Sequence, residues 1–258
     1  MINKKIKISI ITVCYNSEET INKTLNSVAS QVYDNIEHII IDGKSTDRTI
    51  NIVKEYFHIK KIISESDNGI YHAMNKGLEI ATGDIIGFLN SDDFYASNHV
   101  LKKIESVFSG NRDIDACYSD LDYIDQVDNK KIIRHWKSCK FTEGLFAKGW
   151  CPPHPTFFAR RSVYKRFGGF NIDYKLASDN DIMMRFLEVH KINVKYVPEV
   201  WVKMRLGGTT NKNFRNIILQ NLEILKALSQ NGLASNLLIF FFNKIFIKVI
   251  QRFKRLTS

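Results

Sequence analysis

The chain has 258 residues, of which 44% are hydrophobic and 12% aromatic, and its formal net charge is +10. This composition excludes an intrinsically disordered chain, because the apolar content is ordinary and the charges are of mixed sign. The length suffices for one large-cored domain, with or without an appendage. The basic excess indicates a polyanionic partner (nucleic acid, nucleotide phosphates or an anionic membrane) unless it only reflects Lys-, Asn- and Ile-rich codon usage.

The four cysteines, Cys14, Cys117, Cys139 and Cys151, are scattered along the chain. They form no Cys-x-x-Cys pair and have no zinc-like spacing with histidine, so no structural zinc site is expected. Scattered thiols suit a reducing compartment. Residues 1–7 are polar and lack the apolar core of a secretory signal. We therefore expect a cytoplasmic location.

The first part of the chain alternates apolar strand-like runs with helical patterns. In chain order, strands are expected at residues 6–13, 36–41, 59–64 and 85–89, and helices at residues 18–31, 47–57 and 70–81. This β-α alternation predicts an α/β fold, with a mostly parallel sheet that helices cover on both faces.

The second part of the chain is less regular. Strands are expected at residues 114–123, 131–137 and 193–197, and helices at residues 162–167, 178–190 and 211–230. A boundary is expected near residues 230–232. It separates a main domain, residues 1–230, from a C-terminal segment, residues 231–258.

Polar side chains stand at or just beyond the ends of the four strands of the first part. They are Thr12 and Asn16, then Asp42, then Asp67, then Asp92 and Asp93. Open parallel sheets bind ligands at the carboxyl ends of their strands, so this edge is the expected ligand site. Such residues also cap helices, as Asp47 is expected to do. Capping explains one or two of these positions more easily than four in succession.

The pair Asp92-Asp93 follows an apolar strand. Mg²⁺ and Mn²⁺ prefer hard oxygen ligands, and they commonly combine few protein carboxylates with water and substrate phosphates. A lone pair of aspartates is a weak signal, because it also ends strands or caps helices. Its position at the expected ligand edge favours a divalent metal bound beside a nucleotide.

Several short motifs follow one another in a specific order. They are Ile10–Asn16, Ile40–Thr49, Ser66–Tyr71, Ala73–Gly77, Gly83–Asp84, Gly87–Asp93, His154–Phe158 and Ser178–Asp181. This series, across roughly residues 6–210, resembles glycosyltransferase family 2 with a Rossmann-like GT-A fold. It most resembles the branch that builds bacterial capsule, exopolysaccharide or lipopolysaccharide units.

The resemblance implies a donor site for a nucleotide-sugar. Thr12 and the loop with Asn16 would line the nucleotide pocket, and Asp42 would accept a hydrogen bond from the base, usually uracil. Asp67 would lie near the base and ribose. Asn75 would belong to the same donor site, Asp92 would contact the ribose or sugar, and Asp93 would bind Mn²⁺ or Mg²⁺.

The resemblance also implies an inverting reaction with Asp179 as the base. A carboxylate must take the proton of the attacking hydroxyl, and a metal must offset the charge on the leaving diphosphate. Asp179 or Ser178 could instead cap the helix that follows. Sequence order favours Asp179 over Asp181 as base, and Asp181 would support the site or cap the helix.

The chain departs from the family pattern at a few positions. Ser178 stands where many relatives have Glu, Met74 where many have Arg, and His72 where many have Asp. These departures affect fine contacts to the nucleotide. The Gln-x-x-Arg-Trp motif of processive synthases is absent from the sequence, so transfer of one sugar per acceptor is expected.

Other polar groups could contact the diphosphate or the acceptor. His154 has this role in one interpretation and lies at a strand edge in the other, and Trp150 is either a sugar-stacking wall or a core residue. A basic cluster consists of Lys203, Arg205, Lys212 and Arg215. It either holds a diphosphate or forms a solvated face.

The C-terminal segment has the pattern of a basic amphipathic helix. Leu238, Phe241 and Phe242 begin its apolar side, whereas Lys244 and Lys248 lie on the opposite side, followed by Gln251 and Arg255. Basic residues interrupt the apolar run, so a membrane span is not expected. The helix is expected to lie in the anionic inner-membrane surface, on the cytosolic face, beside a polyprenyl-diphosphate-linked acceptor. Packing against the domain or a partner subunit is the alternative.

Three other functions remain open from the residues. A sugar nucleotidyltransferase would need a Gly-rich, Arg-containing phosphate loop after the first strand, where this chain has residues 14–18, Cys-Tyr-Asn-Ser-Glu. A nucleic-acid-binding module would interleave aromatic and basic residues on strands, which this sequence does not, so no nucleic acid is expected. A non-catalytic relative that binds sugar nucleotides has the same sequence pattern.

Overall fold

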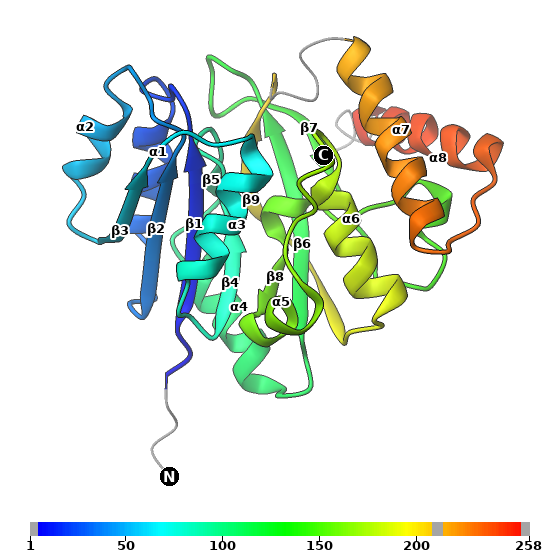
Figure 1. Cartoon of the computed structure of the whole chain (residues 1–258), viewed down its shortest axis with the longest axis horizontal. Helices are drawn as coiled ribbons and strands as arrows, with labels where there is room; N and C mark the ends of the chain where they lie inside the picture. Colours follow the sequence, from blue (N-terminus) through cyan, green and yellow to red (C-terminus); the bar gives the residue numbers. More distant parts are fainter. Residues whose placement is uncertain (1–4, 208–213, 254–258) are drawn as a thin grey trace.

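The computed structural model describes residues 5–207 and 214–253 and shows a curled sheet flanked by helices (Figure 1). The first part contains β1 (Ile8–Cys14), α1 (Ile21–Ala29), β2 (Ile36–Asp42), α2 (Thr49–Lys54), β3 (Ile59–Ser64), α3 (Ile70–Ile80) and β4 (Ile85–Phe88). β5 (Phe94–Tyr95), α4 (Val100–Gly110), β6 (Ala116–Ile124) and β7 (Ile132–Trp136) follow.

The remaining elements complete the sheet and end in two helices. They are the 3₁₀ turns η1 (Phe146–Lys148) and η2 (His154–Thr156), β8 (Phe158–Arg160), α5 (Arg161–Phe167), α6 (Ser178–Met184), the π-helical turn η3 (Arg185–Val189), β9 (Val194–Arg205), α7 (Phe214–Gln230) and α8 (Leu237–Phe253). Figure 1 shows α7 and α8 together at one end of the molecule, opposite α2.

The strand order of the described sheet is β3-β2-β1-β4-β8-β6-β9-β5, and β7 pairs with β6. β1, β2, β3 and β4 are mutually parallel, whereas β8 is antiparallel to both β4 and β6. β6 therefore runs in the same direction as β4, and β9 is parallel to β6. The expected α/β fold with a mostly parallel sheet is confirmed, and the carboxyl ends of these strands meet at one edge.

Two layers of helices cover the sheet. On one face α3, α5, α6 and α7 bury apolar side chains in one cluster, which also takes in Phe240 of α8. On the other face lie α1, α2 and α4. Every residue of β1 and β4 is buried, because helices pack on both faces of these strands. Two of the strands that lead to the ligand edge, β1 and β4, therefore lie inside the core.

The predicted elements of the first part are confirmed, with ends shifted by a few residues. Residues 211–213 of the expected last helix of the main domain lie outside the described residues. Among the α-helices and strands of the described residues, α4, β5 and β8 were not predicted from the sequence, and neither were the 3₁₀ turns η1 and η2. β5 and β8 are too short to show a periodic pattern. The helix expected at residues 178–190 changes at Arg185 into a π-helical turn.

The C-terminal helices do not reach the dimensions of a membrane span. Within residues 5–207 and 214–253, no helix combines the length and apolarity needed to cross a lipid bilayer.

Gly87 of β4 is a point of close contact between strands. It pairs with Phe158 of β8, and a Cβ added at Gly87 would lie 2.1 Å from the Phe158 ring. We expect Gly87→Ala to lower the free energy of unfolding by about 1–3 kcal/mol, because the buried ring must move. Denaturant unfolding measures this change.

Gly110→Ala is the matched control, since a Cβ there has no neighbour within 4 Å at the end of α4. Alanine should be neutral or slightly stabilising at that position. Equal stability of Gly87→Ala and the wild type would contradict the close contact.

Candidate active site

The site lies at the edge where β1, β2 and β3 end. Cys14, Asp42 and Ser64 are neighbours there in strand register. Asp42 is fully buried, and its carboxylate accepts hydrogen bonds from the Ser45 N–H (3.0 Å) and the Ser64 hydroxyl (2.6 Å). It also accepts one from the Ser45 hydroxyl. These bonds fix the loop after β2.

Asn16 joins the loop after β1 to the loop after β2. Its backbone has φ +47°, in the left-handed region that Asn tolerates better than most residues. Its side-chain oxygen accepts the Thr46 N–H (2.9 Å), and its own N–H donates to the Ser45 hydroxyl (2.8 Å). The two loops therefore form one connected wall of the site.

Thr12 lies inside the sheet. Its side chain is fully buried, and its hydroxyl oxygen is 3.0 Å from Nε2 of His38. Nδ1 of His38 is in turn 2.9 Å from Nε2 of His58. Burial lowers the pKa of His38 to about 3, so its imidazole is neutral at pH 7. Thr12 thus supports the edge from below rather than facing the pocket with its hydroxyl.

Asp67 follows β3 and faces two basic side chains from α3. Its Oδ1 is 2.8 Å from Nζ of Lys76 and 3.1 Å from Nδ1 of His72. Its Oδ2 is buried and has no hydrogen-bond partner in the described part of the chain. Asn75 of α3 contacts the protein itself, because its amide donates to the Phe170 carbonyl (2.8 Å) and accepts from the Phe170 N–H (2.9 Å).

The loop after β4 holds an acidic pair with unpartnered oxygens. Asp93 is fully buried, and among the residues that the structure describes neither Asp93 Oδ1 nor the side-chain oxygen of Asn90 has a hydrogen-bond partner. Burial, and then the charge of Asp92, raises the pKa of Asp93 well above its usual range. Burial also raises the pKa of Asp92, although the charge of Arg205 opposes this. Such oxygens are suited to a cation, which would favour the ionised carboxylates.

Asp179, in the first turn of α6, is held by two side chains. Its Oδ1 accepts a hydrogen bond from the Tyr71 hydroxyl (3.1 Å), and its Oδ2 is 3.2 Å from Nδ1 of His154. No side chain caps α6, whose N-cap residue is Ala177. The carboxylate of Asp179 is therefore turned to Tyr71 and His154, and capping does not account for it.

His154 links Asp179 to the acidic loop. Burial lowers the pKa of His154, so the neutral ring is favoured despite the neighbouring carboxylate. Because a carboxylate only accepts, we assign the ring proton to Nδ1, which leaves Nε2 to accept from the Asn90 amide 3.5 Å away. The same amide lies 3.4 Å from Asp93 Oδ2. A polar chain thus runs from Tyr71 through Asp179, His154 and Asn90 to Asp93.

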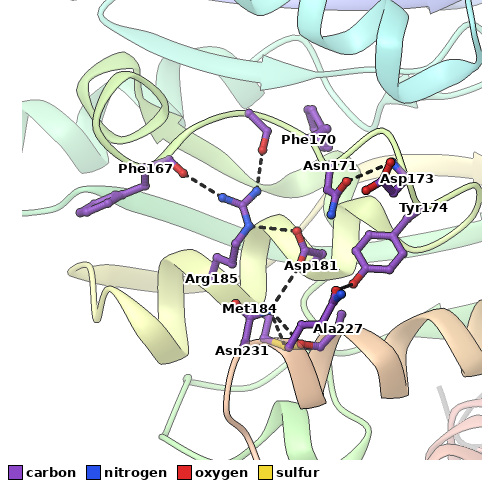
Figure 2. A network of polar contacts seen from close by, with 12 residues as sticks. Phe167, Phe170, Asn171, Asp173, Tyr174, Asp181, Met184, Arg185, Ala227 and Asn231 are labelled. Carbon is purple, nitrogen blue, oxygen red and sulfur yellow. Dashed lines mark hydrogen bonds and ion pairs between the residues drawn. The ribbon is translucent and has the colours of Figure 1, made fainter.

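Asp181 lies on the other side of α6 from this chain. Figure 2 shows its carboxylate between the Arg185 guanidinium and the Asn231 amide, at 2.9 Å and 3.2 Å. Side chains two residues apart on a helix point in nearly opposite directions, and this separates the carboxylate of Asp181 from that of Asp179.

The basic residues after β9 are only partly brought together. Arg205 lies close enough to Asp92 and Asp93 for its charge to lower the pKa of both. Lys203 lies near Lys23, and Arg215 is exposed on α7. Lys212 lies outside the described residues. Arg205 is thus the member of the cluster next to the acidic pair.

Trp150 packs edge-on against Tyr118 and Phe146, which supports a core position.

The protein does not supply a complete set of metal ligands within the described residues. In the described ranges, no three His, Cys, Asp or Glu side chains gather closely enough to hold a metal ion by themselves. A cation at Asp93 would thus depend on further ligands from substrate or water, the pattern common for Mg²⁺.

Sequence reasoning missed two members of the polar chain, Tyr71 and Asn90. Tyr71 belongs to one of the motifs that carry the family resemblance, but nothing in the sequence shows that its hydroxyl, on α3, reaches Asp179 on α6. Asn90 adjoins the acidic pair in sequence, so its position was the available signal.

Solved structures of other proteins share this fold. S. aureus TarS 1–349 in complex with UDP-GlcNAc aligns with a TM-score of 0.63 and 19% identity, over 86% of this chain and 66% of that chain. The mannosyltransferase PcManGT from Pyrobaculum calidifontis, in complex with GDP-Man and Mn²⁺, aligns with a TM-score of 0.66 and 16% identity, over 95% and 70%. At these identities the likeness shows the fold, which is that of GT-A glycosyltransferases.

Sequence similarity shows the family. The pattern of glycosyl transferase family 2 matches residues 9–168. The PGL/p-HBAD biosynthesis glycosyltransferase of Mycobacterium bovis is 28% identical over 208 residues, which cover 79% of this chain and 78% of that protein. The chain belongs to glycosyl transferase family 2, as its motifs indicated, and is a glycosyltransferase.

The Tyr71 hydroxyl offers a direct test of the site geometry. We expect Tyr71→Phe to lower the rate of sugar transfer about tenfold, because one of the two groups that orient Asp179 is lost. The Phe ring keeps the stacking of Tyr71 on Phe170. Steady-state kinetics with the donor that the wild type uses measures the change.

Tyr164→Phe is the matched control. Tyr164 is buried in the same apolar cluster, and no hydrogen bond of its hydroxyl is recorded within the described residues. Equal rates for Tyr71→Phe and Tyr164→Phe would show that the bond to Asp179 has no role in transfer.

Proposed function

We propose that the chain is an inverting, metal-dependent, non-processive glycosyltransferase. It moves one sugar from a nucleotide-sugar, in our proposal a UDP-sugar, to a glycan or lipid-linked acceptor in bacterial surface polysaccharide synthesis. The observation that carries the proposal is the carboxylate of Asp179, held by Tyr71 and His154 and linked to the acidic loop of Asp93. TarS and PcManGT, which share the fold, hold UDP-GlcNAc and GDP-Man.

Asp179 is the proposed base. Inversion needs one attack by an acceptor hydroxyl, on the side of the sugar opposite the departing nucleotide diphosphate, with a carboxylate in reach of the hydroxyl proton. Tyr71 and the His154 Nδ1–H donate to Asp179, so they hold the carboxylate in place while free lone pairs remain for the proton. Their position in separate elements keeps the carboxylate oriented before the acceptor arrives.

The proposed donor site follows the strand edge. Asn16 and Asp42 shape the wall for the base, Asp67 offers an unpartnered oxygen towards the ribose side, and Asp92 contacts the ribose or sugar. Thr12 and Asn75 would act indirectly, through the sheet and through the Phe170 segment. Arg205 and His154 lie near Asp92, where they would contact the diphosphate.

Asp93 is the proposed residue for Mn²⁺ or Mg²⁺. The buried oxygens Asp93 Oδ1 and Asn90 Oδ1 have no partner within residues 5–207 and 214–253, and they suit a hard divalent cation. When bound, the metal would stabilise charge on the leaving diphosphate.

Two substitutions test the chemistry. Asp179→Asn and Asp93→Asn should each reduce transfer at least a hundredfold, because one removes the base and the other a metal ligand. Release of nucleotide diphosphate in the presence of acceptor measures turnover, and circular dichroism confirms the fold.

Asp113→Asn, which alters an exposed carboxylate, is the control and should turn over as the wild type does. Wild-type turnover by Asp179→Asn or Asp93→Asn would remove that residue from the mechanism.

The proposed location is the cytosolic face of the plasma membrane, with a polyprenyl-diphosphate-linked acceptor. α8 exposes large apolar side chains, among them Leu238 (83%), Phe242 (66%) and Phe246 (50%). α7, which Lys244 of α8 joins through Asn221, exposes Phe214, Ile218 and Leu222 at helical spacing. No acidic residue follows Glu223 in the sequence. An apolar, basic surface of this kind fits an anionic bilayer interface.

The membrane proposal predicts lipid-dependent sedimentation. The wild type should sediment with vesicles that contain phosphatidylglycerol, and the double variant Leu238→Glu/Phe242→Glu should bind at least tenfold more weakly. Each buried aromatic or aliphatic side chain contributes about 1.5–3 kcal/mol, and the added acids are repelled.

Phe57→Glu changes a side chain that is 97% exposed, next to α2 and remote from α8, so it is the matched control. Binding of the double variant equal to that of Phe57→Glu would rule out α8 as the membrane surface.

A further inference from the structure

Several side chains of α7 hold the first turn of α6, which carries Asp179, and the segment before it. Gln220 donates to the Leu176 carbonyl (3.3 Å), and Gln230 accepts from the Tyr174 hydroxyl.

Two further places involve buried carboxylates, and the first of these precedes the turn. Glu223 of α7 is buried, and its two carboxylate oxygens accept the backbone N–H groups of Lys175 (2.9 Å) and Leu176 (2.8 Å). Hydrogen bonds to a charged acceptor are among the stronger ones in proteins. Glu223 therefore fixes the backbone that leads into α6.

The second place is on the turn itself. Asn231, directly after α7, donates its amide to Asp181 Oδ1 (3.2 Å) and to the Ala227 carbonyl of its own helix (2.8 Å). The other oxygen of Asp181 accepts from Nε of Arg185 (2.9 Å). Asp181 is 3% exposed, so these two donors satisfy a carboxylate that is out of water. Figure 2 shows the three side chains converging between α6 and α7.

Arg185 continues the network to α3. It begins the π-helical turn after α6, and its guanidinium donates to the carbonyls of Phe167 (2.8 Å) and Gly169 (2.5 Å). The next residue, Phe170, is bonded through both backbone polar groups to Asn75 of α3. One helical turn before Asn75, Tyr71 donates to Asp179. Hydrogen bonds thus connect α6, the segment of residues 167–170 and α3 around Asp179, the proposed base.

We propose that α7 is a positioning element for the base, with Glu223 and Asn231 as its positioning residues. This inference rests on the proposed role of Asp179. Glu223 holds the backbone that leads into α6, and Asn231 holds the Asp181 side chain on its first turn. Through these contacts the carboxylate of Asp179 meets Tyr71 and His154. Displacement of a reacting group by about 1 Å can reduce a rate up to a hundredfold, so loss of either contact acts on the chemical step.

A merely structural role of α7 makes a different prediction. Loss of packing would lower the melting temperature but leave kcat per folded molecule unchanged below that temperature. A positioning role lowers kcat with the fold intact and leaves KM for the nucleotide-sugar unchanged, because the donor edge at β1 to β4 is separate from α7.

The test compares two asparagines of the same helix pair. Asn231 and Asn221 each donate to the carbonyl four residues earlier, at 2.8 Å in both cases. The Asn231 amide also donates to Asp181 and lies 4.0 Å from the Met184 sulfur, whereas the side-chain oxygen of Asn221 accepts from Lys244 of α8. We expect Asn231→Leu to lower kcat about tenfold at unchanged donor KM, and Asn221→Leu to stay within twofold of the wild type.

Glu223→Gln is a second variant, in which the new side chain has nearly the same shape as the old one. It replaces one acceptor oxygen by a donor opposite a backbone N–H, and it should also lower kcat at unchanged donor KM. The melting temperature of each variant is measured, and all assays are run below it. Wild-type kcat in both Asn231→Leu and Glu223→Gln overturns the inference, as does a loss that Asn221→Leu shares.

Different results would contradict the proposed function and the positioning role of α7. A wild-type protein that transfers no sugar from any nucleotide-sugar contradicts the proposed function. A wild type that transfers sugar, together with unaffected Asn231 and Glu223 variants, contradicts only the positioning role.

Discussion

The carboxylate of Asp179 depends on contact between three segments that are far apart in the sequence. Tyr71 comes from α3, His154 from η2, and Asp179 from α6. None of these contacts forms unless the parallel sheet is complete, because α3 connects β3 to β4 and η2 immediately precedes β8 next to β4. The same sheet sets the acidic loop after β4. The placement of the proposed base and of the proposed metal-binding acid is therefore a consequence of strand order.

Burial disfavours the charged forms of several side chains in the site. Burial raises the pKa of both Asp92 and Asp93, while burial lowers the pKa of His154. Both trends oppose the charged forms, as expected where a pocket removes side chains from water. A bound cation and a diphosphate would supply the missing opposite charges. In the proposed account, donor and metal thus complete an arrangement that the chain alone leaves partly unpaired.

The sequence predicted the sheet, the polar strand ends and the family, because these depend on periodicity and motif order. It did not predict side-chain direction. Thr12 bonds within the sheet and Asn75 bonds Phe170, although the family resemblance assigned both to the donor site. Asp181 faces Arg185, where the resemblance left support of the site and a helix cap both open. Which side of α6 faces the cleft is decided by its packing on α7, and no local pattern encodes that.

A donor screen is the direct test of metal-dependent sugar transfer from a nucleotide-sugar. Purified protein is incubated with membrane lipid extract, Mn²⁺ or Mg²⁺, and a panel of nucleotide-sugars, and the release of nucleotide diphosphate is measured. The account predicts release from one donor, in our proposal a UDP-sugar, that requires both the metal and the lipid extract. Release that persists after chelation of the metal, or no release from any donor, would contradict metal-dependent transfer from a nucleotide-sugar.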